Sequence, residues 1–121
     1  MNVSSPVDFG HSPFEFTPHS DYYLIRFAGD LDLDLAREFE KRLQKKLPEI
    51  KTAILIDFSL CKGMHPQWFR VLMNLVSHAR SIHKKLRCFG MPDKLRFYLA
   101  ENGMDSTLQN FSTLETAKAD L

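Results

Sequence analysis

The sequence predicts a single-domain α/β fold, in which a small mixed sheet of about five strands packs against about four helices. Three observations point to this class. The stretch 53–56 is an uninterrupted apolar run bounded by the charge of Asp57, a pattern typical of a strand covered on both faces. Strand-like and helix-like segments alternate along the chain, as they do in strand–helix–strand units. The length of 121 residues suits one hydrophobic core.

The elements follow from periodicity and from breaking residues. A flexible leader is expected over 1–13, which is rich in Ser, Pro and Gly, and the domain over 14–121. Strands are predicted at 14–17, 22–28, 53–56, 86–91 and 108–111, the first two as a hairpin. Helices are predicted at 35–47, 66–84, 92–101 and 113–121.

Capping residues mark the predicted helix ends. Asp34 is the expected N-cap of the first helix, and Gly103 suits the position after the third. Ser112 and Glu115 have the spacing of a capping box for the last helix.

Composition excludes several classes of function. The 16 basic and 15 acidic side chains leave a net charge of +1, which disfavours nucleic acid and anionic membranes as partners. Two cysteines, Cys61 and Cys88, are too few for a disulfide framework or a four-ligand zinc site, so buried, reduced thiols are expected. The sequence shows no pattern of a membrane span or a signal peptide, so we expect a cytoplasmic protein. We also expect no metal and no cofactor.

The loop after the central strand is the expected functional region. In an α/β sheet, ligands and partners usually sit where such a loop leaves the carboxyl end of a strand and meets the next helix. Here that loop contains Gly63, and Pro66 stands where the next helix should begin.

Three motifs in this order resemble the STAS domain, the fold of bacterial anti-sigma factor antagonists. AGDLDLDLA at 28–36 is similar to the family's strand-ending Gly-x-Leu-Asp, and ILIDFS at 54–59 to its Leu-x-Asp-Leu-Ser. ENGMDSTLQNFSTLETAKADL at 101–121 is similar to its Gly-Leu-x-x-x-Phe and final capped helix. The resemblance covers residues 14–121 and implies helices mainly on one side of the sheet, with function by docking instead of catalysis.

The resemblance also implies a regulatory site that this chain lacks. In the family's antagonists the loop after the central strand reads Asp-Ser-Ser-Gly, and a serine there is phosphorylated by a partner kinase that is also the anti-sigma factor. The apolar register of 69–72 sets His65, Pro66, Gln67 and Trp68 against those four positions. Because Pro66 and Gln67 carry no hydroxyl, we expect no phosphorylation switch at the family position, and a contact surface that is fixed or regulated in some other way.

The expected partner-binding residues lie in two loops. From the 63–69 loop we include Met64 as an adaptable contact, together with His65, Pro66, Gln67 and Trp68. Asp30 and Asp32 are added from the 30–34 loop, because the matching loop of the family lies beside the switch loop.

Some assignments stay open at this stage. Trp68 can be an exposed interface anchor or can pack into the core, and the sequence favours neither. An exposed patch at Phe14 or Trp68 would favour a homodimer. Asp30, Asp32 and Asp34 resemble the start of a calcium loop, but Leu35 and Lys41 stand where that loop needs Gly and Glu, so capping and turn formation explain the aspartates better.

Two other functions compete with docking to an anti-sigma factor or kinase. The chain could be the STAS subunit of a membrane lipid-transport ATPase, as some family members are. It could also be a receiver-like domain with Asp57 as phosphoacceptor, although Asp30 and Asp32 lie too close in sequence to supply that fold's acidic pair. A general enzyme is disfavoured because the motifs give no nucleophile, base and orienting acid.

Overall fold

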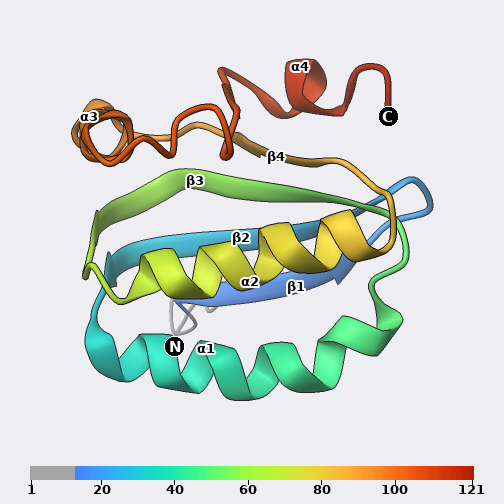
Figure 1. Ribbon diagram of the computed structural model, residues 1–121, viewed down its shortest axis with the longest axis horizontal. Coiled ribbons are helices and arrows are strands. Elements are labelled where there is room, and N and C mark those ends of the chain that lie inside the picture. The colour runs from blue at the N-terminus through green and yellow to red at the C-terminus, as the bar shows by residue number, and fades with distance from the viewer. Residues whose placement is uncertain (1–12) are drawn as a thin grey trace, which may run out of the picture.

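The computed structural model describes residues 13–121, which form a mixed five-stranded sheet with helices packed on it (Figure 1). The strands are β1 (Phe14–Pro18), β2 (Tyr22–Leu31), β3 (Ala53–Met64), β4 (Leu86–Phe89) and β5 (Asn110–Phe111). The helices are α1 (Leu33–Lys46), the short 3₁₀ turn η2 (Leu47–Glu49), α2 (Trp68–Ser81), α3 (Asp93–Glu101) and α4 (Leu114–Lys118).

The strands lie across the sheet in chain order. β1 is antiparallel to β2, and each later strand is parallel to the one before it. The predicted α/β class, a hairpin followed by strand–helix–strand units, is confirmed. The expected leader lies outside the described residues except for Pro13, and it stays a prediction.

The main core lies between the sheet and the helices α1 and α2, which cover one face of it (Figure 1). Alternate residues of β2 and β3 point into this core: Tyr23, Ile25, Phe27, Ile54, Ile56 and Phe58. Each fully buried side chain of this size contributes about 1.5–3 kcal/mol. The opposite face carries a smaller cluster, in which Leu24, Leu55 and Phe89 pack under Ala117 of α4.

The central strand β3 is longer than predicted. It runs on to Met64, well beyond the predicted end at Ile56, because its second half pairs with an equally extended β2. Gly29 has φ +77° but does not end β2, because it pairs with Cys61. The register shifts between Arg26 and Ala28 and again between Gly29 and Asp30, and the pairing continues to Leu31. The predicted functional loops therefore begin as a pair of hydrogen-bonded strands.

Two predicted caps are wrong by one or two residues. Asp32, not Asp34, caps α1, since its side chain accepts a hydrogen bond from the amide of Leu35 at 2.9 Å. The last helix is capped by Thr113 and Thr116, whose side chains and amides bond reciprocally, instead of by Ser112 and Glu115. This helix is also shorter than predicted, because it ends at Lys118.

The two cysteines are free, as expected, and both are buried. Burial raises the pKa of the Cys61 thiol to about 11 and raises that of Cys88 further, which keeps both thiols protonated. Across residues 13–121, no helix combines the length and the apolar character needed to cross a bilayer.

Candidate functional site: two adjoining loops and a groove

The predicted loop residues meet at the carboxyl ends of β2 and β3. The amide of His65 donates to the carbonyl oxygen of Leu31 at 2.7 Å, which joins the chain after β3 to the end of β2. Asp30, Asp32, His65 and Pro66 are exposed, whereas Met64 and Gln67 are half-buried. We call these six residues the carboxyl-end surface.

Trp68 does not belong to that surface. Its side chain is fully buried, with ring centroids 5.2 Å from Phe27 and 5.3 Å from Phe39. The indole nitrogen Nε1 donates to the carbonyl oxygen of Asp32 at 2.8 Å, so the polar atom of the ring is satisfied inside the protein. Of the two placements that the sequence left open, burial is the one observed, and an exposed Trp68 anchor is wrong.

Burial also removes the premise for a homodimer, because Phe14 is only 4% exposed and Trp68 is not exposed. The indole has a different role, since it ties the start of α2 to the start of α1. Asp32 makes the connection with two groups. Its carbonyl oxygen accepts the hydrogen bond from the Trp68 indole, and its side chain accepts one from the amide of Leu35 in the first turn of α1. Trp68 is therefore a positioning residue that holds the two loops together.

The amide groups at the start of α2 are occupied by neighbouring atoms. The His65 ring nitrogen Nδ1 accepts a hydrogen bond from the amide of Gln67 at 3.0 Å. The next amides, of Trp68 and Phe69, donate to the carbonyl oxygens of His65 and Pro66 at 2.9 and 3.0 Å. A helix start offers an anion its free amides, and here the loop itself fills them.

The aspartates of the 30–34 loop have local roles. Asp30 lies opposite Gly63 in the strand pairing, and a Cβ at position 63 would sit 3.0 Å from the Asp30 oxygen Oδ1. Asp32 caps α1. Among residues 13–121, no group of three or more His, Cys, Asp or Glu side chains could hold a metal ion.

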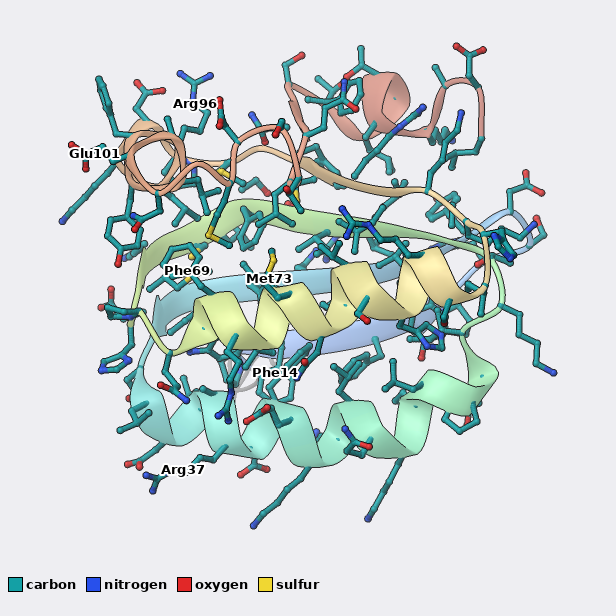
Figure 2. The ribbon with its side chains drawn as sticks, in the orientation of Figure 1. Phe14, Arg37, Phe69, Met73, Arg96 and Glu101 are labelled. Atoms are coloured by element: carbon teal, nitrogen blue, oxygen red, sulfur yellow. The ribbon has the colours of Figure 1, made fainter. Side chains whose placement is uncertain are left out.

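A groove of about 460 Å³ adjoins the carboxyl-end surface. It lies between the end of β3 and α3, and its lining residues are Cys61, Lys62, Gly63, Met64, Pro66, Pro92, Lys94, Leu95, Phe97, Tyr98 and Glu101. Beside the groove, Phe69 of α2 lies on the side facing α3 (Figure 2), and its ring centroid is 4.7 Å from that of Tyr98. Met64 and Pro66 are shared by the groove and the carboxyl-end surface.

Phe97 is the groove residue that the sequence reasoning missed. It is 72% exposed, which is unusual for a phenylalanine on a helix. The signal was present, because Leu95 and Leu99 are spaced four apart and define the buried face of α3, which leaves Phe97 on the outer face. Phe97 therefore adds an exposed aromatic ring to the groove beside the carboxyl-end surface.

Asp57 does not have the geometry of a phosphoacceptor. It is 5% exposed, and its oxygen Oδ1 accepts hydrogen bonds from the amide and hydroxyl of Ser59 at 2.8 and 2.6 Å. The other oxygen accepts from Arg26 Nε at 3.1 Å. Asp57 also lies in the middle of β3, not at its end, and both carboxylate oxygens are engaged. The receiver interpretation finds no open carboxylate here.

Solved structures share the fold of this chain. An unphosphorylated anti-sigma factor antagonist, SpoIIAA, is similar with a TM-score of 0.74 and 11% identity, over 85% of this chain and 91% of that one. A putative anti-sigma factor antagonist from Thermotoga maritima gives a TM-score of 0.78 and 16% identity, over 88% and 92%. Part of a murine solute carrier 26 anion transporter gives 0.69 and 11%, over 93% of this chain and 19% of the transporter.

These likenesses show an α/β fold of the SpoIIAA type. No curated protein sequence matches the chain. A family model described as "Mlab, STAS domain" matches residues 17–111, which is most of the sequence. The chain therefore belongs to the STAS domain family.

Proposed function

We propose that this protein is a non-enzymatic, cytoplasmic interaction module that docks to an anti-sigma factor or kinase-type partner without the family's serine switch. The docking area comprises the carboxyl-end surface and the adjoining groove. The observation that carries the proposal is the junction of the two predicted loops, which the Trp68 indole holds in one arrangement through its 2.8 Å bond to Asp32.

The groove supports docking because it offers apolar area next to polar, exposed loops. An exposed aromatic ring at the edge of a concave, mostly apolar surface is typical of an interface anchor, and Phe97 has that position. Lys62, Lys94 and Glu101 contribute charges of both signs to the lining, which suits a polar rim.

Two features support a contact surface without a phosphorylation switch. Pro66 and Gln67 replace the family's serines, so the loop has no hydroxyl at those positions. The His65 ring and backbone also occupy the amides of Gln67 and Trp68, which would otherwise stabilise a phosphate at this helix start.

Affinity capture from the native cytosol tests the docking area with three variants. Gln67→Asp and Phe97→Ser alter the proposed contacts, whereas Ser77→Asp adds the same charge to an exposed position farther along α2. We expect the unmodified chain and Ser77→Asp to capture one common protein that the other two variants lose. Equal capture by all four proteins would show that the interface lies on another face, which would contradict the proposed docking area.

The missing switch is tested with the captured partner and ATP. We expect the intact mass of the chain to stay unchanged, while a Pro66→Ser, Gln67→Ser double variant supplies hydroxyls at the family positions as a control. Phosphate on Ser59 or Thr52 of the unmodified chain, together with loss of binding, would contradict a fixed surface.

A second candidate is the STAS subunit of a membrane lipid-transport ATPase. It stays a candidate because the matched family model is described as "Mlab, STAS domain" and not as an anti-sigma factor antagonist, whereas the similar solved structures include such antagonists. The captured protein separates the two candidates: a kinase-type or anti-sigma protein supports the first, and a transport ATPase supports the second.

A further inference from the structure

The near-zero net charge conceals an uneven distribution. Basic residues gather where α1 and α2 end and where β3 and β4 begin: Lys45, Lys46, Lys51, Arg80, Lys84 and Lys85. None of these six forms an ion pair with a carboxylate in the part of the chain that the structure describes. The carboxyl-end surface, with Asp30 and Asp32, lies at the opposite end of the parallel strands. Asp21, Glu49 and Asp120 lie at this end as well, but basic residues outnumber them, and we call this amino end of the sheet the basic region.

A hollow of about 430 Å³ opens in this basic region. Its lining comes from four chain segments: the β1–β2 turn, the start of β3, the loop before β4 and residue 121. The lining residues are Ser20, Asp21, Thr52, Ala53, His83, Lys84, Lys85 and Leu121. Figure 1 shows the turn between β1 and β2 and the loop leading into β4 at the same end of the molecule.

Several hydrogen-bond donors in the hollow have no acceptor among residues 13–121. Within residues 13–121, no hydrogen bond is formed by the Ser20 hydroxyl, the His83 ring or the Lys84 ammonium. Lys85 is held in place, because its Nζ donates to the carbonyl oxygen of Asp120 at 2.9 Å. The site thus combines one oriented ammonium group with several available donors.

The backbone at the end of α2 carries His83 and Lys84 into this region. His83 has φ +57°, a left-handed conformation in which glycine is the usual residue after a helix. The amide of Lys84 then donates to the carbonyl oxygen of Ala79 at 2.9 Å, which ends the helix firmly. Residue 83 thus carries an imidazole side chain in a backbone conformation that glycine usually adopts.

We propose that this hollow binds a phosphate group, either of a free phosphate ester or of an anionic lipid headgroup. Lys84 and Lys85 supply the positive charge, and Ser20 and His83 supply donors for the phosphate oxygens, whereas the Thr52 hydroxyl lines the hollow but donates to the carbonyl oxygen of Ala53 at 3.2 Å. Asp21 opposes the anion and keeps the affinity modest. The lysines outside the hollow attract anions at longer range. Because the site lies at the opposite end of the sheet from the docking area, the two can be occupied together.

The test uses two probes on the full chain: glycerol 3-phosphate, and vesicles of phosphatidic acid in phosphatidylcholine. Amide NMR shifts of Thr52, Lys84 and Lys85 report the free ester, and co-sedimentation reports the vesicles. Sodium acetate at matched ionic strength controls for a general salt effect. Stronger binding to vesicles than to the ester identifies a lipid headgroup, the reverse identifies a free ester, and either outcome supports a phosphate site.

Matched variants separate a site from a diffuse field. Lys84→Gln and Lys45→Gln remove the same charge, but only Lys84 lines the hollow. We expect Lys84→Gln to weaken binding roughly tenfold and Lys45→Gln less than about twofold. Asp21→Asn should strengthen binding. Equal losses in the two lysine variants, or no amide shift in the hollow with either probe, would overturn the proposal without affecting the docking function.

Discussion

Replacing Trp68 with phenylalanine tests whether the indole positions the two loops from inside the protein. The change removes the hydrogen bond from Nε1 to the Asp32 carbonyl oxygen and leaves a small cavity beside Phe27 and Phe39. The carbonyl oxygen is not orphaned, because it still accepts from the amide of Ala36 at 3.1 Å. The lost hydrogen bond therefore costs about 1 kcal/mol, and the cavity adds about 1–2 kcal/mol.

A loss of about 2–3 kcal/mol from the free energy of unfolding lowers Tm by on the order of 10 °C in a domain of this size. Urea unfolding and calorimetry measure this loss. Hydrogen exchange should show faster exchange at the Leu35 amide, which depends on the Asp32 cap, and partner binding should weaken as the loops loosen. Leu75→Ala is the matched control, because it opens a cavity in the buried face of α2 outside the two loops. It should lower stability by a similar amount and leave the Leu35 amide protected.

The outcome that refutes this reasoning is specific. Trp68 is the single tryptophan of the chain, so fluorescence reports it directly. We expect blue-shifted emission and weak quenching by acrylamide, with and without the partner. If Trp68→Phe abolished binding while the free energy of unfolding stayed the same, or if quenching were strong in the free protein, the indole would be a surface contact and not a positioning residue.

Three further predictions follow from other contacts. Acetyl phosphate with magnesium should leave the intact mass unchanged, because both oxygens of Asp57 are engaged; an adduct there would revive the receiver interpretation. Gly90→Ala should destabilise more than Gly29→Ala in urea unfolding, about 2–4 against about 1–2 kcal/mol. Both glycines have positive φ, but only at position 90 would a Cβ meet the backbone of Ser59, at 3.0 Å, so equal costs would contradict the packing. Because burial raises the pKa of Cys61 from 9.0 to about 11, its contribution to stability is complete below pH 9 and is lost between pH 9 and 11. Urea unfolding across that range should show the decline, and Cys61→Ser should make it shallower without removing it, because burial raises the pKa of the Cys88 thiol as well.

The fold was predictable because its strongest signals are local and agree with one another. The apolar run at 53–56 and the spacing of Phe39 and Leu43 identify a buried strand and a core-facing helix, and the structure buries all of them. Element ends were less accurate, because they depend on pairing between distant segments. Ser59–Met64 carries no strand pattern of its own, and β2 alone makes it a strand.

The candidate site was predictable in place but not in side-chain detail. Chain order and sheet handedness put residues 30–34 beside 63–69, and the hydrogen bond from His65 to Leu31 joins them there. Whether Trp68 points outward depends on the space left by Phe27 and Phe39 and on a carbonyl acceptor in another loop. No local pattern in the sequence carries that information.

The departures from the family pattern at 65–68 can be understood together. A loop that receives and loses a phosphate needs a hydroxyl, free amides at the helix start and room to adjust. Here Pro66 and Gln67 remove the hydroxyl, His65 fills an amide, and the buried Trp68 fixes the loop to its neighbour. We infer that restoring serines alone would give a loop that can be phosphorylated but responds weakly, because His65 and Trp68 still hold it in place. Partner affinity of the Pro66→Ser, Gln67→Ser variant should then change little on phosphorylation. A large change would show that the hydroxyl alone carries the switch, and that the packing beneath it is incidental.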